Sequence, residues 1–290
     1  MTDARVSFLA VAGVMWKREM LRYVRDRSQI FGAVSRTILW LIILGFGLGA
    51  SLREIEGYTY AQYILPGVIT LNVLFASLQA AIALVYDREV GLLREVIVSP
   101  APILAVTLGK VLGGATISVI QGSIPLLFAP FIDGLPSFPY VLLALLVMFF
   151  MGLLLTSLGI VIAARLKTFE GFGAISNGVI LPLYFLSGSI FPLKGIIGGI
   201  GFLQIPEALR EELRRVGVYS IGGGWVVQLP WWIEVLVYAN PVSYQLDLLR
   251  YALLRFQQLP MTADLLVTFA LPPIAVVVAA VAMRRMVQTR

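Results

Sequence analysis

The chain has 290 residues, of which 59% are hydrophobic and 13% are charged, and its formal net charge is +6. Soluble domains carry about 45–50% apolar and about 25% charged residues, so this chain has too few charges to cover a soluble surface. Its mean hydropathy of +0.91 indicates an integral membrane protein. The basic surplus is informative through its position along the chain rather than as an affinity for nucleic acid, and no nucleic-acid partner is expected.

Missing residue types exclude several chemistries. The chain has no cysteine and no histidine, which excludes thiol nucleophiles, disulfides, Cys/His zinc sites and Ser-His-Asp triads. Gly109-Lys110 lacks both the earlier glycine and the following Ser or Thr of a phosphate-binding loop. No paired or membrane-embedded carboxylates are expected, which disfavours a carboxylate proton relay. We therefore expect that the chain is not an enzyme and has no cofactor or metal of its own.

Six hydrophobic runs predict membrane spans, because each is near the ~20 residues that cross a ~30 Å hydrocarbon core as a helix. They cover about 31–51, 61–85, 103–130, 140–164, 173–193 and 265–283. The runs do not alternate as barrel strands would, so the predicted fold class is an all-α integral membrane protein with six transmembrane helices. Pro66, Pro125 and Pro182 predict kinks within spans, and the fifth span is the least regular.

The basic residues predict the orientation in the membrane. The thirteen on one predicted side are Arg5, Lys17, Arg18, Arg22, Arg25, Arg27, Arg88, Arg94, Arg165, Lys167, Arg284, Arg285 and Arg290. The short loops on the opposite side, 52–60 and 131–139, carry only Arg53. Because cytoplasmic loops carry an excess of Lys and Arg, both termini are expected in the cytoplasm. The expected location is the plasma (inner) membrane.

Residues 1–28 are expected to be a cytoplasmic segment that contains an amphipathic helix over 6–28. Its predicted apolar face holds Leu9, Gly13, Trp16, Met20, Tyr23 and Val24, and its polar face holds Lys17, Arg18, Glu19, Arg22, Arg25 and Asp26. A helix with a basic face and a Trp anchor is expected to lie in the membrane interface. Two interpretations stay open: a plain orientation anchor, or a docking helix whose candidate residues are Trp16, Lys17, Arg18, Arg22 and Arg25.

Residues 29–193 hold spans one to five, and the first loop on the predicted cytoplasmic side lies within them. Val90, Leu93 and Val96 recur at helical spacing, Asp87 can cap, and Ser99-Pro100 stops a helix. This pattern predicts a short charged helix over 87–98. It is either an ordinary interfacial turn or a helix that inserts into a groove on a soluble partner. The candidate contact residues are Asp87, Arg88, Glu89, Gly91, Leu93, Arg94 and Glu95.

The segment 194–264 is too long for a plain connector and is expected on the extracytoplasmic side. Residues 206–217 have the Pro, acidic and basic positions of a capped amphipathic helix. The stretch 231–258 has two apolar pieces broken at Asn240-Pro241, and each piece is too short to cross. We expect re-entrant helices that dip into the outer leaflet. The last span and a cytoplasmic tail follow at 265–290.

Uncharged polar side chains lie inside the predicted spans. They are Asn72, Gln79, Gln121, Ser123, Asn177, Ser187 and Ser189. Hydrogen bonding between helices is the favoured interpretation, and the sharper alternative is a substrate path that includes Asn72, Gln79, Gln121, Asn177 and Ser187.

Two basic residues and two glycine pairs complete the predicted spans. Arg36 and Lys110 are predicted near span ends, where they can extend to the headgroups. Gly45/Gly49 and Gly109/Gly113 each predict a close-packing face.

Several motifs in order resemble one known family. Asp87-Arg88-Glu89-x-Gly with Arg94-Glu95, Ser99-Pro100 and Leu108-Gly109-Lys110 is similar to permeases of type-2 ATP-binding-cassette (ABC) exporters. Leu186-Ser187-Gly188 with Phe191-Pro192-Leu193 adds to the resemblance, as does a re-entrant motif with Asn240, Pro241, Tyr244, Asp247 and Arg250. The resemblance covers nearly the whole chain and points to the branch of daunorubicin-resistance, nodulation-factor and polysaccharide exporters. The segment around 195–230 is longer than this family pattern.

The resemblance implies partners and a mechanism. It implies two permease copies, identical or different, two cytoplasmic ABC ATPase subunits, and a coupling helix near 87–98. The leading hypothesis is a permease subunit of an ATP-driven exporter that moves an amphiphilic drug, lipid or lipid-linked glycan out of the cytoplasm, in contact with membrane lipid. The alternatives are a non-transporting membrane scaffold or assembly protein and, less favoured, a secondary carrier.

Overall fold

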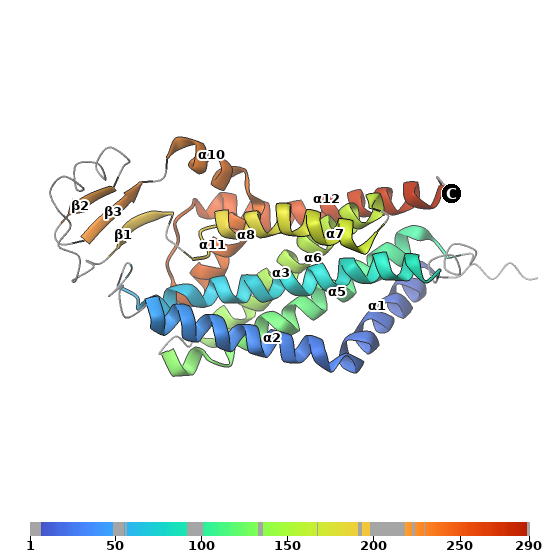
Figure 1. The fold of residues 1–290 in the computed structure, drawn as a ribbon, viewed down its shortest axis with the longest axis horizontal. Helices are drawn as coiled ribbons and strands as arrows, with labels where there is room; N and C mark the ends of the chain where they lie inside the picture. Colours follow the sequence, from blue (N-terminus) through green and yellow to red (C-terminus); the bar gives the residue numbers. More distant parts are fainter. Residues whose placement is uncertain are drawn as a thin grey trace, which may run out of the picture.

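The computed structural model describes residues 7–48, 55, 57–91, 101–132, 136–166, 168–190, 193–197, 218–221, 224–228 and 230–288. Long helices run side by side along the longest axis of the molecule (Figure 1). Helix α1 (Phe8–Arg25) and the end of α12 (Met261–Gln288) lie at one end, which we name the α1 end. Three short strands lie at the other end, which we name the sheet end.

Six helical segments are long and apolar enough to cross a membrane, as the sequence predicts. They are Arg27–Gly45, Tyr60–Glu89, Ile103–Leu126, Phe138–Arg165, Phe169–Leu186 and Met261–Gln288. Helices α3 (Tyr60–Glu89), α5 (Ile103–Leu126), α6 (Phe138–Arg165) and α12 each form one span. The multi-pass, helical membrane architecture is therefore confirmed.

The first and fifth spans are built from more than one element. The first joins α2 (Arg27–Trp40) to the π-helical η1 (Leu41–Leu48). The fifth joins α7 (Phe169–Ile175), the π-helical η3 (Ser176–Ile180) and α8 (Leu181–Leu186). The fifth span is thus irregular, as predicted, and Pro182 follows directly on its π-helical turn.

The first span begins earlier than predicted, because Asp26 ends α1 and caps α2. The Asp26 carboxylate accepts hydrogen bonds from the Ser28 hydroxyl at 2.5 Å, the Gln29 side-chain amide at 2.9 Å and the Ser28 backbone N–H at 3.2 Å. These hydrogen bonds, that of the Ser28 hydroxyl first, lower the pKa of Asp26, so its charge is retained at a helix N-terminus, where it is favourable. Since the span runs over Arg27–Gly45, Arg36 lies at its middle and not near its end, which corrects the sequence prediction.

Helix α3 is the centre of the bundle. Tyr63, Leu65, Val68 and Leu74 on this helix are completely buried, in a core shared with α5, α6 and α11 (Pro241–Leu254). A helix that is apolar on all sides is stable in the interior of a bundle. From this central position α3 places the polar side chains that it also carries.

Helix α1 packs on α5 through the predicted glycine pair. A Cβ at Gly109 would meet the Ala12 carbonyl oxygen at 2.5 Å, and a Cβ at Gly113 would meet Glu19 Cβ at 2.7 Å. The buried residues of α1 are Ala12, Met15, Glu19 and Tyr23. Glu19, assigned to the polar face, is therefore buried, whereas Leu9 and Val24, assigned to the apolar face, are exposed. The assignment of Glu19 to a solvated polar face is wrong, because the glycines admit α1 closely on the side where Lys110 meets Glu19.

The segment after α8 contains strands that the sequence analysis does not predict. Strands β1 (Lys194–Ile197), β2 (Val218–Ile221) and β3 (Gly224–Gln228) form an antiparallel sheet in the order β1-β3-β2. The predicted helix over 206–217 lies outside the described residues. Two helices follow, α10 (Trp231–Ala239) and α11, separated at Asn240 as predicted. A short 3-10 turn, η2 (Ala129–Ile132), follows α5.

We expect Gly109→Ala to lower the thermal stability of the purified chain, because the added methyl group overpacks the α1–α5 contact. Overpacking of this kind costs about 1–3 kcal/mol. The measurement is the midpoint of thermal unfolding in detergent.

Gly13→Ala is the matched control, because a Cβ at Gly13 in α1 would meet nothing within 4 Å. It should leave the midpoint unchanged or raise it, since alanine favours a helix over glycine by about 1 kcal/mol. Equal effects of the two substitutions would contradict the close contact.

Candidate functional site at the α1 end

Buried charges join α1, α3 and α5 at the α1 end. Lys110 Nζ lies 2.9 Å from Glu19 Oε1 and 2.8 Å from Asp87 Oδ2. On the other side of the same carboxylate, Arg18 Nη2 and Arg22 Nη2 lie 2.9 Å and 3.3 Å from Asp87 Oδ1. We name these five residues the junction cluster. It connects three helices that are far apart in sequence.

The junction cluster is buried at its centre and open at its edge. The side chains of Asp87, Lys110 and Glu19 are 1%, 4% and 5% exposed, whereas those of Arg18 and Arg22 are about a third exposed. A buried charge is tolerated only when it is paired, and removing one partner of a buried pair typically costs about 3–5 kcal/mol. The cluster therefore fixes the position of α1 against the end of α3.

The end of α3 also contacts the loop between α6 and α7. Arg88 Nη1 donates to the Leu166 carbonyl oxygen at 2.6 Å, and the Phe169 backbone N–H donates to Glu89 Oε1 at 3.3 Å. The helix then ends, because Gly91 has a φ of +81°, which glycine adopts without strain. The end of α3 and the loop between α6 and α7 are therefore held together at the α1 end of the molecule.

The sequence analysis predicts a coupling helix over 87–98, but its first residues belong to α3. Residues 87–89 form the last turn of α3, and Asp87 is a centre of the junction cluster and does not cap a new helix. The physical reason is that Asp87 has three cations within reach, which stabilise it better than a helix N-terminus would. Leu93, Arg94 and Glu95 lie outside the described residues.

The predicted N-terminal residues take different places. Arg18 and Arg22 belong to the junction cluster, and Trp16 Nε1 donates to Thr116 Oγ1 of α5 at 3.1 Å. Lys17 and Arg25 are exposed. With Arg18 and Arg22 they line an open surface hollow of about 730 Å³, which Val14, Leu21 and Asp26 complete. Sequence reasoning missed Glu19 and Lys110 as site residues; the signal was an acidic residue among basic ones and a lysine between two close-packing glycines.

A second polar cluster lies in the middle of the spans. Arg36 Nε donates to Asn72 Oδ1 at 2.8 Å, and its Nη2 lies 3.5 Å from Gln121 Oε1. Asn72 donates to Thr37 at 2.7 Å, and Gln121 lies 3.5 Å from Gln79. The expected hydrogen bonds between spans are thus observed at Asn72 and Gln121. Arg36, which the sequence analysis placed near a span end, belongs to this cluster because the first span starts earlier than predicted.

Asn177 and Ser187 do not join this mid-span cluster. Asn177 is exposed on η3. Ser187 is buried at the sheet end, where its hydroxyl donates to the Tyr184 carbonyl oxygen at 2.6 Å. The structure therefore brings together three of the five residues predicted for a substrate path.

The motif from Asn240 to Arg250 builds a rigid corner at the sheet end. Asn240 caps α11 by accepting from the Val242 N–H at 3.0 Å and donates to the Leu183 carbonyl of α8 at 2.6 Å, and Pro241 occupies the first turn. Tyr244 donates to the Tyr238 carbonyl of α10 at 2.8 Å. These contacts hold α8, α10 and α11 together.

Arg250 and Asp247 continue that corner inward. Arg250 is fully buried, donates to the Gly188 carbonyl at 2.8 Å and stacks over the Tyr63 ring of α3 at 4.6 Å. Asp247 accepts from the backbone N–H groups of Gln258 and Leu259, each at 2.8 Å. The two motifs of the sequence, around Gly188 and around Asp247, therefore meet in space.

One carboxylate lies where none was expected. Asp264 is fully buried in the first turn of α12, within the last span, and neither oxygen of its carboxyl group has a hydrogen-bond partner among the described residues. The sequence analysis placed Asp264 just outside the span, and the helix begins four residues earlier than predicted. The expectation of no membrane-embedded carboxylate is therefore wrong at this position.

Six candidate spans within the described residues, with a buried charge junction at one end and an ordered corner at the other, define a polytopic membrane protein. Comparison with known families agrees: the family described as "ABC-2 type transporter" matches residues 11–205. The chain belongs to this family and is an ABC transporter permease, a membrane transport component that is not itself an ATPase.

Several curated proteins are related to this chain at low sequence identity. Nodulation protein J of Azorhizobium caulinodans is 28% identical over 66% of this chain and 75% of its own length. The inner membrane transport permease YadH of Escherichia coli strain K12 is 24% identical over 88% of both chains. The putative transport permease ycf38 of Cyanophora paradoxa is 22% identical over 84% of this chain and 74% of its own.

We expect Lys110→Met to destabilise the chain strongly, because Glu19 and Asp87 would lose their shared buried cation. Breaking a buried pair costs about 3–5 kcal/mol, which denaturant unfolding of the purified chain measures. Adding Glu19→Gln should restore part of the loss.

Lys17→Met is the matched control, because Lys17 is exposed on the same region of α1. It should change the free energy of unfolding by no more than about 0.5 kcal/mol. If Lys110→Met behaved like Lys17→Met, the junction cluster would not stabilise the fold as described.

Proposed function

We propose that this chain is the permease subunit of an ATP-driven exporter that moves an amphiphilic substrate out of the cytoplasm. ABC-2 permeases normally work with an ABC ATPase subunit. In this proposal two permease copies, identical or different, stand beside each other in the lipid, and ATP is hydrolysed on cytoplasmic partners. Both termini and the α1 end lie in the cytoplasm.

The distribution of basic residues supports this orientation. The observed span boundaries keep Arg88, Arg165, Arg284 and Arg285 at the α1 end. Membrane proteins retain Lys and Arg on the cytoplasmic side. Lys17 and Arg25, which α1 exposes around its hollow, add further charge to the same end.

The junction cluster supports transmission of force from the ATPase. Asp87 and Glu89 lie at the start of the segment 87–98 that is proposed to contact the ATPase, and Leu93, Arg94 and Glu95 lie further along it. Because Asp87 is bound to α1 and α5 by ion pairs, displacement of this segment would move the three helices together. Rigid-body movement of packed helices is a common way to open and close a path.

The character of the spans supports an amphiphilic cargo. Asn72, Gln79 and Gln121 form a polar region around Arg36 between otherwise apolar helices. A molecule with a polar head and an apolar body matches both surfaces, whereas small inorganic ions match only the first.

Single cysteines test the orientation cleanly, because the chain contains none of its own. We expect Ser137→Cys, exposed at the sheet end, to react with a membrane-impermeant maleimide in intact cells. Gln288→Cys, exposed at the end of α12, should react only after the membrane is permeabilised. The opposite pattern would overturn the orientation.

The complex tests the function itself. The chain, purified through a tag from its native membrane, should bring an ATPase subunit with it. Arg94→Ala and Glu89→Ala should reduce the stimulation of ATP hydrolysis by the permease at least tenfold, since both residues lie at the proposed contact. The measurement is ATP turnover of the complex in vesicles.

Arg284→Ala is the control, because Arg284 is an exposed basic residue at the same end of the molecule. It should leave the stimulation unchanged. A chain that purifies without an ATPase, or whose complex is unaffected by Arg94→Ala and Glu89→Ala, would be a scaffold and not a transporter.

A further inference from the structure

Arg36 is a cation in the middle of a membrane span. It lies nine residues from Arg27, which is about 13 Å along the axis of a helix, and nine residues from the other end of the span at Gly45. Its guanidinium carbon lies 4.3 Å from the centre of the Phe75 ring, so an aromatic face supports one side of it. Cations at this depth are costly, and they face a bundle interior or a polar path where they serve a function.

No carboxylate neutralises Arg36 among the residues that the structure describes. Its hydrogen-bond partners are the uncharged amides of Asn72 and Gln121. These occupy Nε and Nη2, and no described side chain or carbonyl accepts from Nη1. Nη1 is not fully buried, so it is accessible. The guanidinium is thus held in place on one edge and open on the other.

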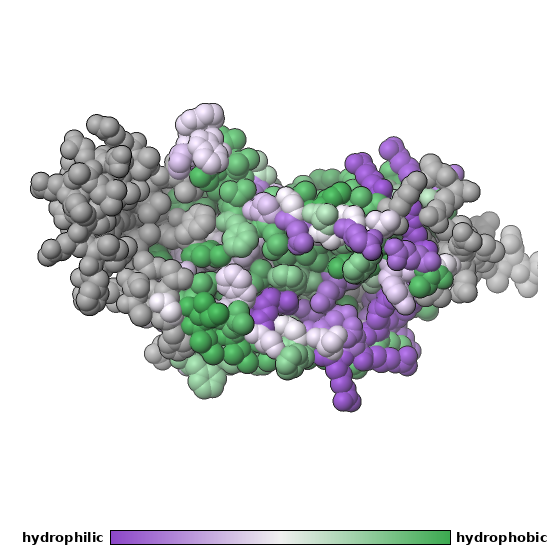
Figure 2. Space-filling model, viewed as in Figure 1, coloured by the Kyte–Doolittle hydropathy of each residue, from purple (hydrophilic) through white to green (hydrophobic). Residues whose placement is uncertain are grey.

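A polar face of α3 runs from the α1 end towards Arg36. Asn72, Ala76, Gln79, Ala83 and Asp87 repeat at helical spacing along this face, with small side chains between the polar ones. A small groove of about 20 Å³ lies beside the part of this face nearer the α1 end, and both polar residues (Glu19, Arg22, Gln29 and Gln79) and apolar ones line it. Hydrophilic residues reach from α1 over the adjoining part of α2 on this side of the molecule (Figure 2).

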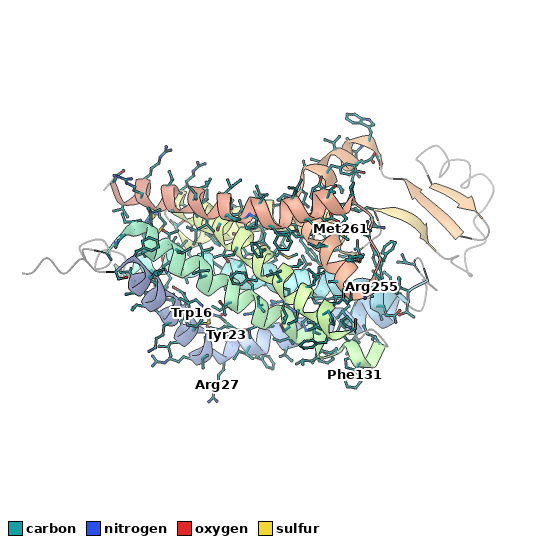
Figure 3. All side chains as sticks on the ribbon, turned by 180° about the vertical axis from the view of Figure 1, so that it is seen from behind. Trp16, Tyr23, Arg27, Phe131, Arg255 and Met261 are labelled. Carbon is teal, nitrogen blue, oxygen red and sulfur yellow. The ribbon has the colours of Figure 1, made fainter. Side chains whose placement is uncertain are left out.

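Figure 3 shows the same region from behind, with Trp16, Tyr23 and Arg27 following one another around the α1–α2 corner. Tyr23 of α1 packs with Ala76 of α3 and Ile117 of α5 beside the groove. The polar face therefore begins at charged residues, is interrupted by these apolar contacts, and ends at Asn72 and its partner Arg36.

We propose that Arg36 binds the acidic head, a phosphate or a carboxylate, of the amphiphile that the permease transports. A guanidinium with one free edge matches such oxygens in geometry and charge. Asn72 and Gln121 orient the guanidinium, and the apolar span surface next to α2 receives the acyl portion. This inference rests on the proposed function for its cargo, but the binding step itself does not require ATP.

Photo-crosslinking of the purified full chain tests the site. Two probes carry a diazirine at the same acyl carbon, one a phosphatidic acid and one a phosphatidylcholine, each at trace level in phosphatidylcholine vesicles. We expect the acidic probe to label peptides of α2 and α3 around Arg36 and Asn72 at least fivefold more than the zwitterionic probe. Equal labelling by the two probes in the unmodified chain would overturn the proposal.

Three variants assign the preference to Arg36. Arg36→Gln should remove it and Arg36→Lys should retain most of it, because the lysine keeps the charge. Arg27→Gln, which removes an exposed arginine at the membrane surface end of the same helix, should leave it unchanged. Loss in Arg27→Gln equal to that in Arg36→Gln would mean ordinary headgroup contact and would overturn the site.

Two further arms separate the sources of the acidic group. Inorganic phosphate should reduce labelling no more than chloride of equal ionic strength; selective displacement by phosphate would show a site for a soluble anion and overturn the amphiphile. In the complex with its ATPase, ATP turnover should lower labelling by the acidic probe at least twofold. Unchanged labelling during turnover would show a resident lipid rather than cargo. If the chain binds no ATPase, the proposed function fails separately, while the vesicle experiment still decides the site.

Discussion

The architecture depends on pairing the charges that the chain buries at one end of its membrane bundle. Asp87 lies in the last turn of the central helix and is surrounded by Lys110, Arg18 and Arg22, while Glu19 shares Lys110 from the opposite side. None of the three inner side chains is stable there alone, since an unpaired buried charge is far more costly than a paired one. The pairing therefore determines where α1 lies, and the glycines of α5 make the short approach sterically feasible.

The same constraint connects structure to function. Asp87, at the centre of the pairing, lies at the start of the segment 87–98 proposed to contact the ATPase, so a push on that segment reaches α1, α3 and α5 at once. Further along α3, the polar face that begins at Asp87 arrives at Asn72 and Arg36. One helix thus carries both the receiver of force and part of the proposed path. At the opposite end, Arg250 and Asn240 fix α11 against α3 and α8, so this end of the bundle is rigid while the helices move.

The sequence predicted what hydrophobic length and local order determine. The six spans, the irregular fifth span and the break at Asn240 follow from apolar runs, prolines and capping residues, and the family follows from motifs in order. The sequence-based prediction failed where tertiary contacts override the local sequence pattern. Glu19 is buried because Lys110 is opposite it, and no helical wheel of residues 6–28 contains that information. The capping of α2 by Asp26 shifted the first span by one turn and placed Arg36 at mid-depth. Strand β1 pairs with β3 across a long intervening segment, which no local pattern encodes. Strands β2 and β3 pair across residues 222 and 223 alone, and the sequence analysis did not use the hairpin signal of those two glycines.

The account makes α1 and α5 one rigid unit, and a distance within that unit tests it most directly. Pulsed electron paramagnetic resonance reports this distance in the complex from spin labels at Lys17→Cys on α1 and Leu104→Cys on α5. Both positions are exposed, and the chain has no native cysteine. The predicted result is the same single narrow distribution in the nucleotide-free and ATP-bound states, with transport retained. A shifted or second distribution on ATP binding would show that α1 moves independently of α5, and it would contradict the central claim.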